Sequence, residues 1–98
     1  MKNIKELKKG DWIFSCYMKP LQFKKWQDNE GFETLEGTTH GISSCGCIPI
    51  SKKYAKWFID NNIDKLYNKH REKENAFDLY ELEVKSICIK ENILYEGI

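Results

Sequence analysis

The feature that most constrains the fold is a stripe of mostly apolar side chains within residues 51–72. Its members recur at intervals of three and four: Ala55, Phe58, Ile59, Asn62, Ile63, Leu66 and Tyr67. This spacing places them on one face of an α-helix that must be buried. Ser51 is a favourable N-cap, and Pro49 disfavours helix just before it. The pattern predicts one main amphipathic helix over about 51–72, although Asn61-Asn62 is a point where it could divide in two.

Extended segments are expected before this helix. Residues 11–18 are rich in aromatic and β-branched side chains and predict a strand. Trp12, Phe14, Cys16 and Met18 alternate onto one face, and Ile13, Ser15 and Tyr17 onto the other. This pattern suggests that one face lies in the core and the other is only partly covered. Residues 19–36 predict a long hairpin or ordered loop with its tip near 29–31 and a short strand over 32–35. Residues 48–50 are expected to be extended.

After the helix, alternation of Tyr80, Leu82 and Val84 with charged residues predicts a long strand over 78–90. The apolar phase changes to Ile87 and Ile89, which suggests a bulge near Ser86. Residues 93–95 are a candidate returning strand. The expected fold class is α+β, a small antiparallel sheet packed against one main helix.

The length of 98 residues suits a single domain, with residues 1–9 as one helical turn or a loose N-terminal segment. The charged start lacks the apolar core of a signal peptide, and no run of about 18 apolar residues suggests a membrane span. We therefore expect a cytoplasmic protein. The net charge of +1, with Arg71 the sole arginine, argues against direct nucleic-acid binding.

The segment from Gly37 to Cys47 is polar and rich in glycine, as in a tight loop. It holds His40, Cys45 and Cys47, which with Cys16 or Cys88 would make four zinc ligands. One residue between Cys45 and Cys47 is shorter than the usual spacing of zinc ligands, so no metal or other cofactor is expected. The other cysteines then read as small buried hydrophobes on strands.

Two further chemistries involve the same region. Cys45 or Cys47 activated by His40 would make a thiol enzyme, but no nucleophile signature surrounds either cysteine. The loop and the helix start at Ser51 could bind an anion through backbone N–H groups. Small polar residues and lysines support that alternative: Thr38, Thr39, Ser43, Ser44, Lys52, Lys53 and Lys56. A turn-rich connection whose lysines only solvate the helix is favoured over it, because no phosphate-binding fingerprint is present.

A protein-binding surface is the fourth possibility. Tyr54 and Trp57 fall beside the main helical stripe, while Phe23 and Trp26 lie in the irregular segment before it. Aromatic anchors of this kind dominate protein interfaces. An acidic run follows them and would form the rim of the surface: Asp28, Glu30, Glu33 and Glu36. The same aromatic residues could instead complete the core, so both interpretations stay open.

The run GTTHGISSCGCIPISKKYAKWFI, from Gly37 to Ile59, loosely resembles small phage-encoded accessory proteins, including anti-defence (anti-CRISPR-like) inhibitors. The resemblance rests on size, composition and the lack of catalytic motifs, and it assigns no residue a role. It implies a stoichiometric binder of a host protein, such as a CRISPR effector or another immune component. We therefore expect a non-enzymatic interaction protein, with a zinc- or anion-binding module centred on 37–53 as the alternative.

Overall fold

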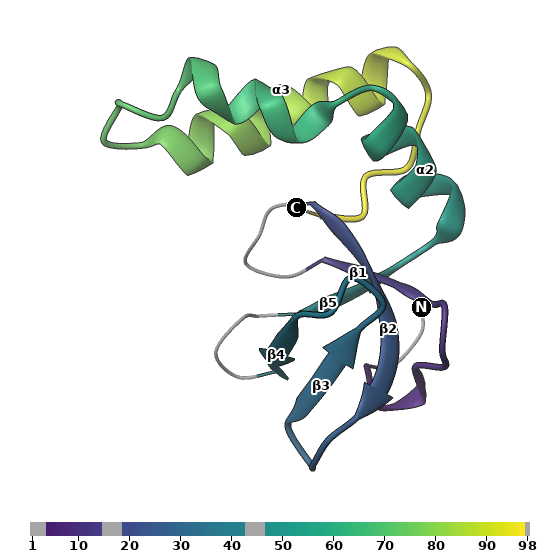
Figure 1. Ribbon diagram of the computed structural model, residues 1–98. Coiled ribbons are helices and arrows are strands. Elements are labelled where there is room, and N and C mark those ends of the chain that lie inside the picture. The colour runs from purple at the N-terminus through teal and green to yellow at the C-terminus, as the bar shows by residue number, and fades with distance from the viewer. Residues whose placement is uncertain (1–3, 15–18, 43–46, 98) are drawn as a thin grey trace.

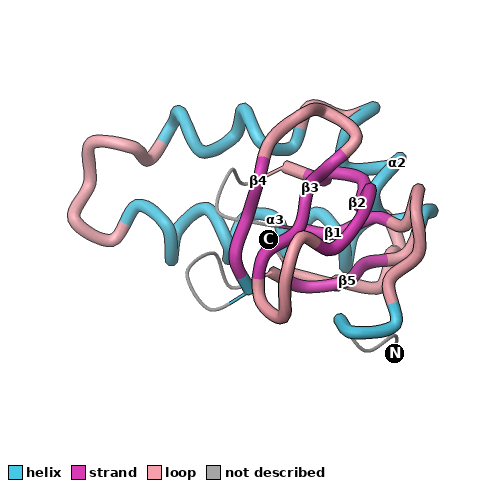
Figure 2. Tube along the Cα trace, turned by 60° about the horizontal axis from the view of Figure 1, so that its bottom comes forward, coloured by secondary structure: helices cyan, strands magenta, loops and turns pink. Residues whose placement is uncertain are grey.

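The computed structural model describes residues 4–14, 19–42 and 47–97, and its fold class is α+β, as the sequence predicts (Figure 1). The sheet precedes both α-helices along the chain. The elements are η1 (Ile4–Glu6), β1 (Trp12–Phe14), β2 (Pro20–Trp26), β3 (Gly31–Thr34), β4 (Thr39–Gly41), β5 (Ile48–Ile50), α2 (Lys52–Asp60), η2 (Ile63–Lys69) and α3 (Ala76–Lys90). Figure 2 shows η2 and the start of α3 extending beyond the sheet as an arm.

The five strands form an antiparallel sheet in the order β4-β3-β2-β1-β5. The first four strands follow one another as a meander, and β5 returns to pair with β1, with Trp12 opposite Ile50. The predicted hairpin is confirmed as β2 and β3. Asp28 shapes its turn by accepting the backbone N–H groups of Glu30 (2.9 Å) and Gly31 (2.6 Å). The expected extension of residues 48–50 is also confirmed.

Strand β1 is covered on both faces, whereas the sequence pattern predicted a partly covered second face. Phe14 packs with the helices, and its neighbour Ile13 packs within the sheet against Leu21, Phe23 and Phe32. Successive strand residues point to opposite faces, so this short strand contributes to two cores. The predicted positions of Ser15, Cys16, Tyr17 and Met18 lie outside the described residues.

The predicted N-cap at Ser51 is confirmed, because its Oγ accepts the backbone N–H of Tyr54 at 3.1 Å. The single helix over 51–72 is not: α2 ends at Asp60, and a 3-10 helix, η2, follows. Asn62 has φ = 51°, a left-handed conformation that asparagine tolerates better than most residues. The two asparagines therefore divide the helix while Ala55, Phe58 and Ile63 stay in one core.

The predicted strand over 78–90 is wrong, because these residues belong to helix α3. Its buried residues recur every fourth position: Ala76, Tyr80, Val84 and Cys88. Tyr80 and Val84 fit both the alternation of a strand and the spacing of a helix. Leu82 distinguishes the two, because a strand would bury it with Val84, whereas it is 60% exposed and Val84 is fully buried. A strand over 78–90 would be about 43 Å long, longer than the 36 Å maximum extent of the molecule.

The remaining C-terminal expectations are also corrected. Ser86 is not at a bulge; its hydroxyl donates to the carbonyl of Leu82, one helical turn earlier, at 3.0 Å. Residues 93–97 form no strand and lead back from α3 toward the start of α2. At the other end, Ile4 packs against the sheet core and Leu7 is buried in it, so the predicted helical turn is confirmed as η1.

Replacing Val84 or Leu82 with alanine separates the helix from the predicted strand. Val84→Ala should lower the free energy of unfolding by about 2 kcal/mol because it leaves a cavity in the core. Leu82→Ala should change it by less than about 0.5 kcal/mol, since its side chain is exposed. Urea denaturation measures both, and similar large losses at the two positions would restore the strand.

Candidate functional site

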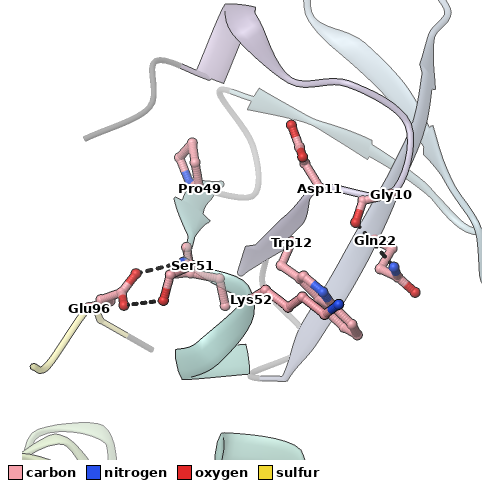
Figure 3. Close-up of a pocket in the computed structure, with 9 residues that line it drawn as sticks. Gly10, Asp11, Trp12, Gln22, Pro49, Ser51, Lys52 and Glu96 are labelled. Atoms are coloured by element: carbon pink, nitrogen blue, oxygen red, sulfur yellow. Dashed lines mark hydrogen bonds between the residues drawn. The ribbon is translucent and has the colours of Figure 1, made fainter. Parts of the chain in front are cut away.

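A pocket of about 460 Å³ opens where the sheet, the start of α2 and the C-terminal segment meet (Figure 3). We call it the junction pocket. Its lining residues come from four parts of the chain: Gly10, Asp11, Trp12, Gln22, Pro49, Ile50, Ser51, Lys52 and Glu96. Trp12, Pro49 and Ile50 give apolar surface, and the other side chains carry charges or hydrogen-bonding groups. This volume lies within the range that is usual for ligand-binding clefts.

Strand pairing builds the pocket floor. Trp12 lies opposite Gln22 on β2 and Ile50 on β5, so β1 brings together segments distant in sequence. Gly10 precedes β1 with φ = 95°, which favours glycine. Its carbonyl accepts the Gln22 side-chain amide at 3.1 Å, while its own N–H donates to the carbonyl of Phe23 at 2.8 Å. This backbone path holds the rim of the pocket against β2.

The C-terminal segment closes one side of the pocket through Glu96. The backbone N–H and the hydroxyl of Ser51 donate to its two carboxylate oxygens at 2.7 and 2.5 Å, drawn as dashed lines in Figure 3. The Tyr54 hydroxyl donates to the carbonyl of Gly97 at 3.0 Å, and burial raises the Tyr54 pKa above its ordinary range. The carboxylate thus already occupies the N-terminal end of α2, the position predicted for an external anion.

The first two turns of α2 carry three exposed lysines, Lys52, Lys53 and Lys56, and its first turn holds no acidic residue. A helix N-terminus carries partial positive charge, so lysines there are electrostatically unfavourable. Lys56 Nζ lies 5.9 Å from the centre of the Trp12 ring, within cation–π range. Of these three lysines, Lys52 lines the pocket, and Lys56 lies near the half-buried Trp12 ring at its border.

The structure places the predicted aromatic anchors unequally. Tyr54 and Phe23 are only 1% and 2% exposed, so both belong to the core and their assignment to a binding surface is corrected. Trp57 is half-buried against Tyr54 and Phe58, and its indole N–H donates to Glu91 at 3.0 Å. Trp26 is half-buried against Phe23 and Phe32, far from α2 in sequence. These residues do not form one aromatic surface, because the fold uses most of their area internally.

The predicted acidic rim lies along the β2–β3 hairpin and the turn after it. Asp28 caps the hairpin turn, and the two backbone hydrogen bonds lower its pKa. Glu33 pairs with Lys24 at 3.4 Å, and Glu36 accepts the backbone N–H of Gln22 at 3.4 Å. Glu30 is exposed at the turn. Asp28, Glu33 and Glu36 thus have roles within the sheet.

The loop over 37–47 is partly described. His40 lies on β4, stacks on Phe32 and bonds through Nε2 to Thr38 Oγ1 at 2.8 Å, and burial lowers its pKa. Cys47 Sγ donates to the carbonyl of Gly41 at 3.9 Å. Cys45, Ser43 and Ser44 lie outside the described residues. Within the described ranges, no three His, Cys, Asp or Glu side chains are grouped so as to hold a metal ion.

Sequence reasoning missed Trp12 and Glu96 as site residues and assigned Lys52 only to the less favoured anion alternative. The alternation around Trp12 left open whether its face lies in the core or is partly covered, and the structure shows Trp12 half-buried. The unusual lysines in the first turn of a capped helix were the available signal. Glu96 had none, because its contact with Ser51 spans 45 residues.

Comparison with protein-family models, with characterised protein sequences and with solved structures finds no match to this chain. None of the helices that the structure describes has the length and apolar character that crossing a membrane requires.

The contact between Ser51 and Glu96 should stabilise the pocket wall. Ser51→Ala removes the helix cap and one bond to Glu96, and should lower the free energy of unfolding by about 1 kcal/mol. Glu96→Gln keeps only part of the interaction, so the two substitutions should be non-additive by about 0.5 kcal/mol or more. Urea denaturation of both single variants and the double variant measures this coupling. Strict additivity would show that the contact contributes nothing, and Ser86→Ala provides a control serine on α3.

Proposed function

We propose that the chain is a non-enzymatic interaction module that binds one partner protein stoichiometrically through the junction pocket. The observation that carries the proposal is the convergence of Trp12, the start of α2 and Glu96 around a hollow of about 460 Å³. Concave sites lined by an aromatic ring and a few polar groups are typical binding sites. Tryptophan is also the residue type most enriched among the energetic centres of protein interfaces.

The hydrogen bonding of the pocket supports binding over catalysis. Ser51 Oγ accepts from the Tyr54 backbone and donates to Glu96, so both functions of this hydroxyl serve the fold. A nucleophilic serine needs a base that accepts its proton and is itself held by a third group. Of the described thiols, Cys88 is buried and its pKa is raised by burial, opposite to the activation that a reactive thiol requires. The other, Cys47, donates to the carbonyl of Gly41.

A narrower form of the proposal is a phage-encoded inhibitor of a host defence protein. It is supported by the resemblance of residues 37–59 to small anti-defence proteins. A stoichiometric inhibitor needs a binding surface and no catalytic group, which suits the junction pocket. Purified protein added to a CRISPR effector should then reduce cleavage of target DNA up to one molar equivalent, and turnover-like inhibition below that ratio would contradict it.

A partner protein that is captured by the immobilised chain serves to test which surface makes the contact. Trp12→Ala should weaken binding by about 2 kcal/mol or more if its ring is a central anchor. Isothermal titration calorimetry measures the affinity and the stoichiometry, and circular dichroism checks that the variant is folded. Lys52→Glu tests the same pocket with an exposed residue whose replacement leaves the core intact.

Two matched variants test other surfaces. Trp26→Ala replaces a half-buried tryptophan that does not line the pocket, and Ile89→Ser alters the outer face of α3, where Ile89 is 82% exposed. Both should bind the partner as the unmodified chain does. Loss of binding in either, with Trp12→Ala unaffected, would move the contact surface away from the junction pocket.

A further inference from the structure

The charge arrangement of the junction pocket specifies the chemistry of its partner. Its two carboxylates already accept backbone donors: Asp11 Oδ2 takes the N–H of Lys8 at 2.8 Å, and Glu96 takes that of Ser51. The ammonium group of Lys52 has no bonding partner within the described part of the chain, and Lys56 contacts only the Trp12 ring there. The two carboxylates keep their negative charge, but their oxygens already accept backbone donors, whereas the ammonium groups of Lys52 in the lining and of Lys56 near the Trp12 ring keep donors for a bound molecule.

The two lysines act as one pair. They are four residues apart on α2, which places their side chains on the same helical face, where like charges repel. Both also lie near the positive end of the helix dipole. A carboxylate placed between them would relieve this repulsion. Natural sequences break such local rules mainly at functional sites.

Trp12 adds the second requirement. Its half-buried ring borders the pocket on a strand residue paired with Ile50, so it offers apolar area near the ammonium group of Lys56. Since Glu96 fills the helix N-terminus, an incoming carboxylate is directed to the two lysines and not to the backbone of α2. A ligand that matches the site carries a carboxylate beside an apolar side chain.

Resting on the proposed function, we infer that the partner inserts an acidic peptide segment into the junction pocket. An aspartate or glutamate side chain pairs with Lys52 and Lys56, and a neighbouring apolar side chain packs on the Trp12 ring. The two lysines give the preference for an acidic side chain, and the Trp12 ring supplies the apolar contact.

The probe is a synthetic peptide with aspartates and glutamates flanking one leucine, compared with the same peptide carrying asparagine and glutamine instead. The indole N–H signals of the three tryptophans are followed by NMR. The acidic peptide should shift the Trp12 signal, leave those of Trp26 and Trp57 in place, and bind more weakly as salt is raised. The neutral peptide should give no comparable shift.

The double variant Lys52→Gln and Lys56→Gln should bind the acidic peptide with an affinity lower by roughly threefold to tenfold, since each exposed ion pair contributes little alone. Lys65→Gln with Lys73→Gln removes the same charge elsewhere and should have no effect. Equal binding of both peptides, or equal loss in both double variants, would overturn the inference. So would saturable binding of single-stranded DNA at Trp12 that is tighter than that of the peptide, or no Trp12 shift with the acidic peptide.

The outcome also separates this inference from the proposed function. If a partner protein shifts the Trp12 indole signal and only the neutral peptide competes with it, the proposed interaction module is supported and the inference of an acidic segment is wrong. If neither a partner protein nor any peptide affects Trp12, the proposed function itself fails.

Discussion

The structure depends on strand β1, whose consecutive residues Ile13 and Phe14 are buried in different cores. Ile13 belongs to the core inside the sheet, and Phe14 contacts Phe58 of α2 in an edge-to-face arrangement, with ring centres 4.9 Å apart. Because the two residues are adjacent on a strand, neither core can shift without moving the other. The same strand places Trp12 opposite Gln22 and Ile50, so the rigid centre of the fold also supplies the wall of the junction pocket.

The helical part of the molecule is tied to this centre at both ends. Its start is fixed by the Ser51 cap and by the strand pairing of Ile50, while the C-terminal segment returns from α3 to the same place. Tyr95 illustrates this return: its ring meets Tyr54 edge-on, and its hydroxyl lies 3.5 Å from Glu81 on α3. Burial and the neighbouring carboxylate raise the Tyr95 pKa to about 12. Glu96 then contacts Ser51, so segments from both ends of the chain define one site.

Local patterns predicted the parts of the fold that local physics determines. The Ser51 cap, the β2–β3 hairpin and the α+β class follow from side chains and turn residues close together in sequence. The strand assigned to 78–90 failed because Tyr80 and Val84 satisfy both a period of two and a spacing of four, and only the exposure of Leu82 distinguishes them. The pocket could not be predicted for another reason. Trp12 and Glu96 are 84 positions apart, and no residue near one of them in the sequence indicates contact with the other.

Both cores form one cooperative unit joined at β1, which keeps the pocket walls in place. Native-state hydrogen exchange measures this directly, because it gives the free energy of opening at individual backbone amides. The most protected amides of the sheet strands and of α3 around Val84 should share one free energy of opening, equal to that of global unfolding. Exchange in α3 at a clearly lower free energy, with the sheet still protected, would show that α3 opens alone and would contradict a single cooperative unit.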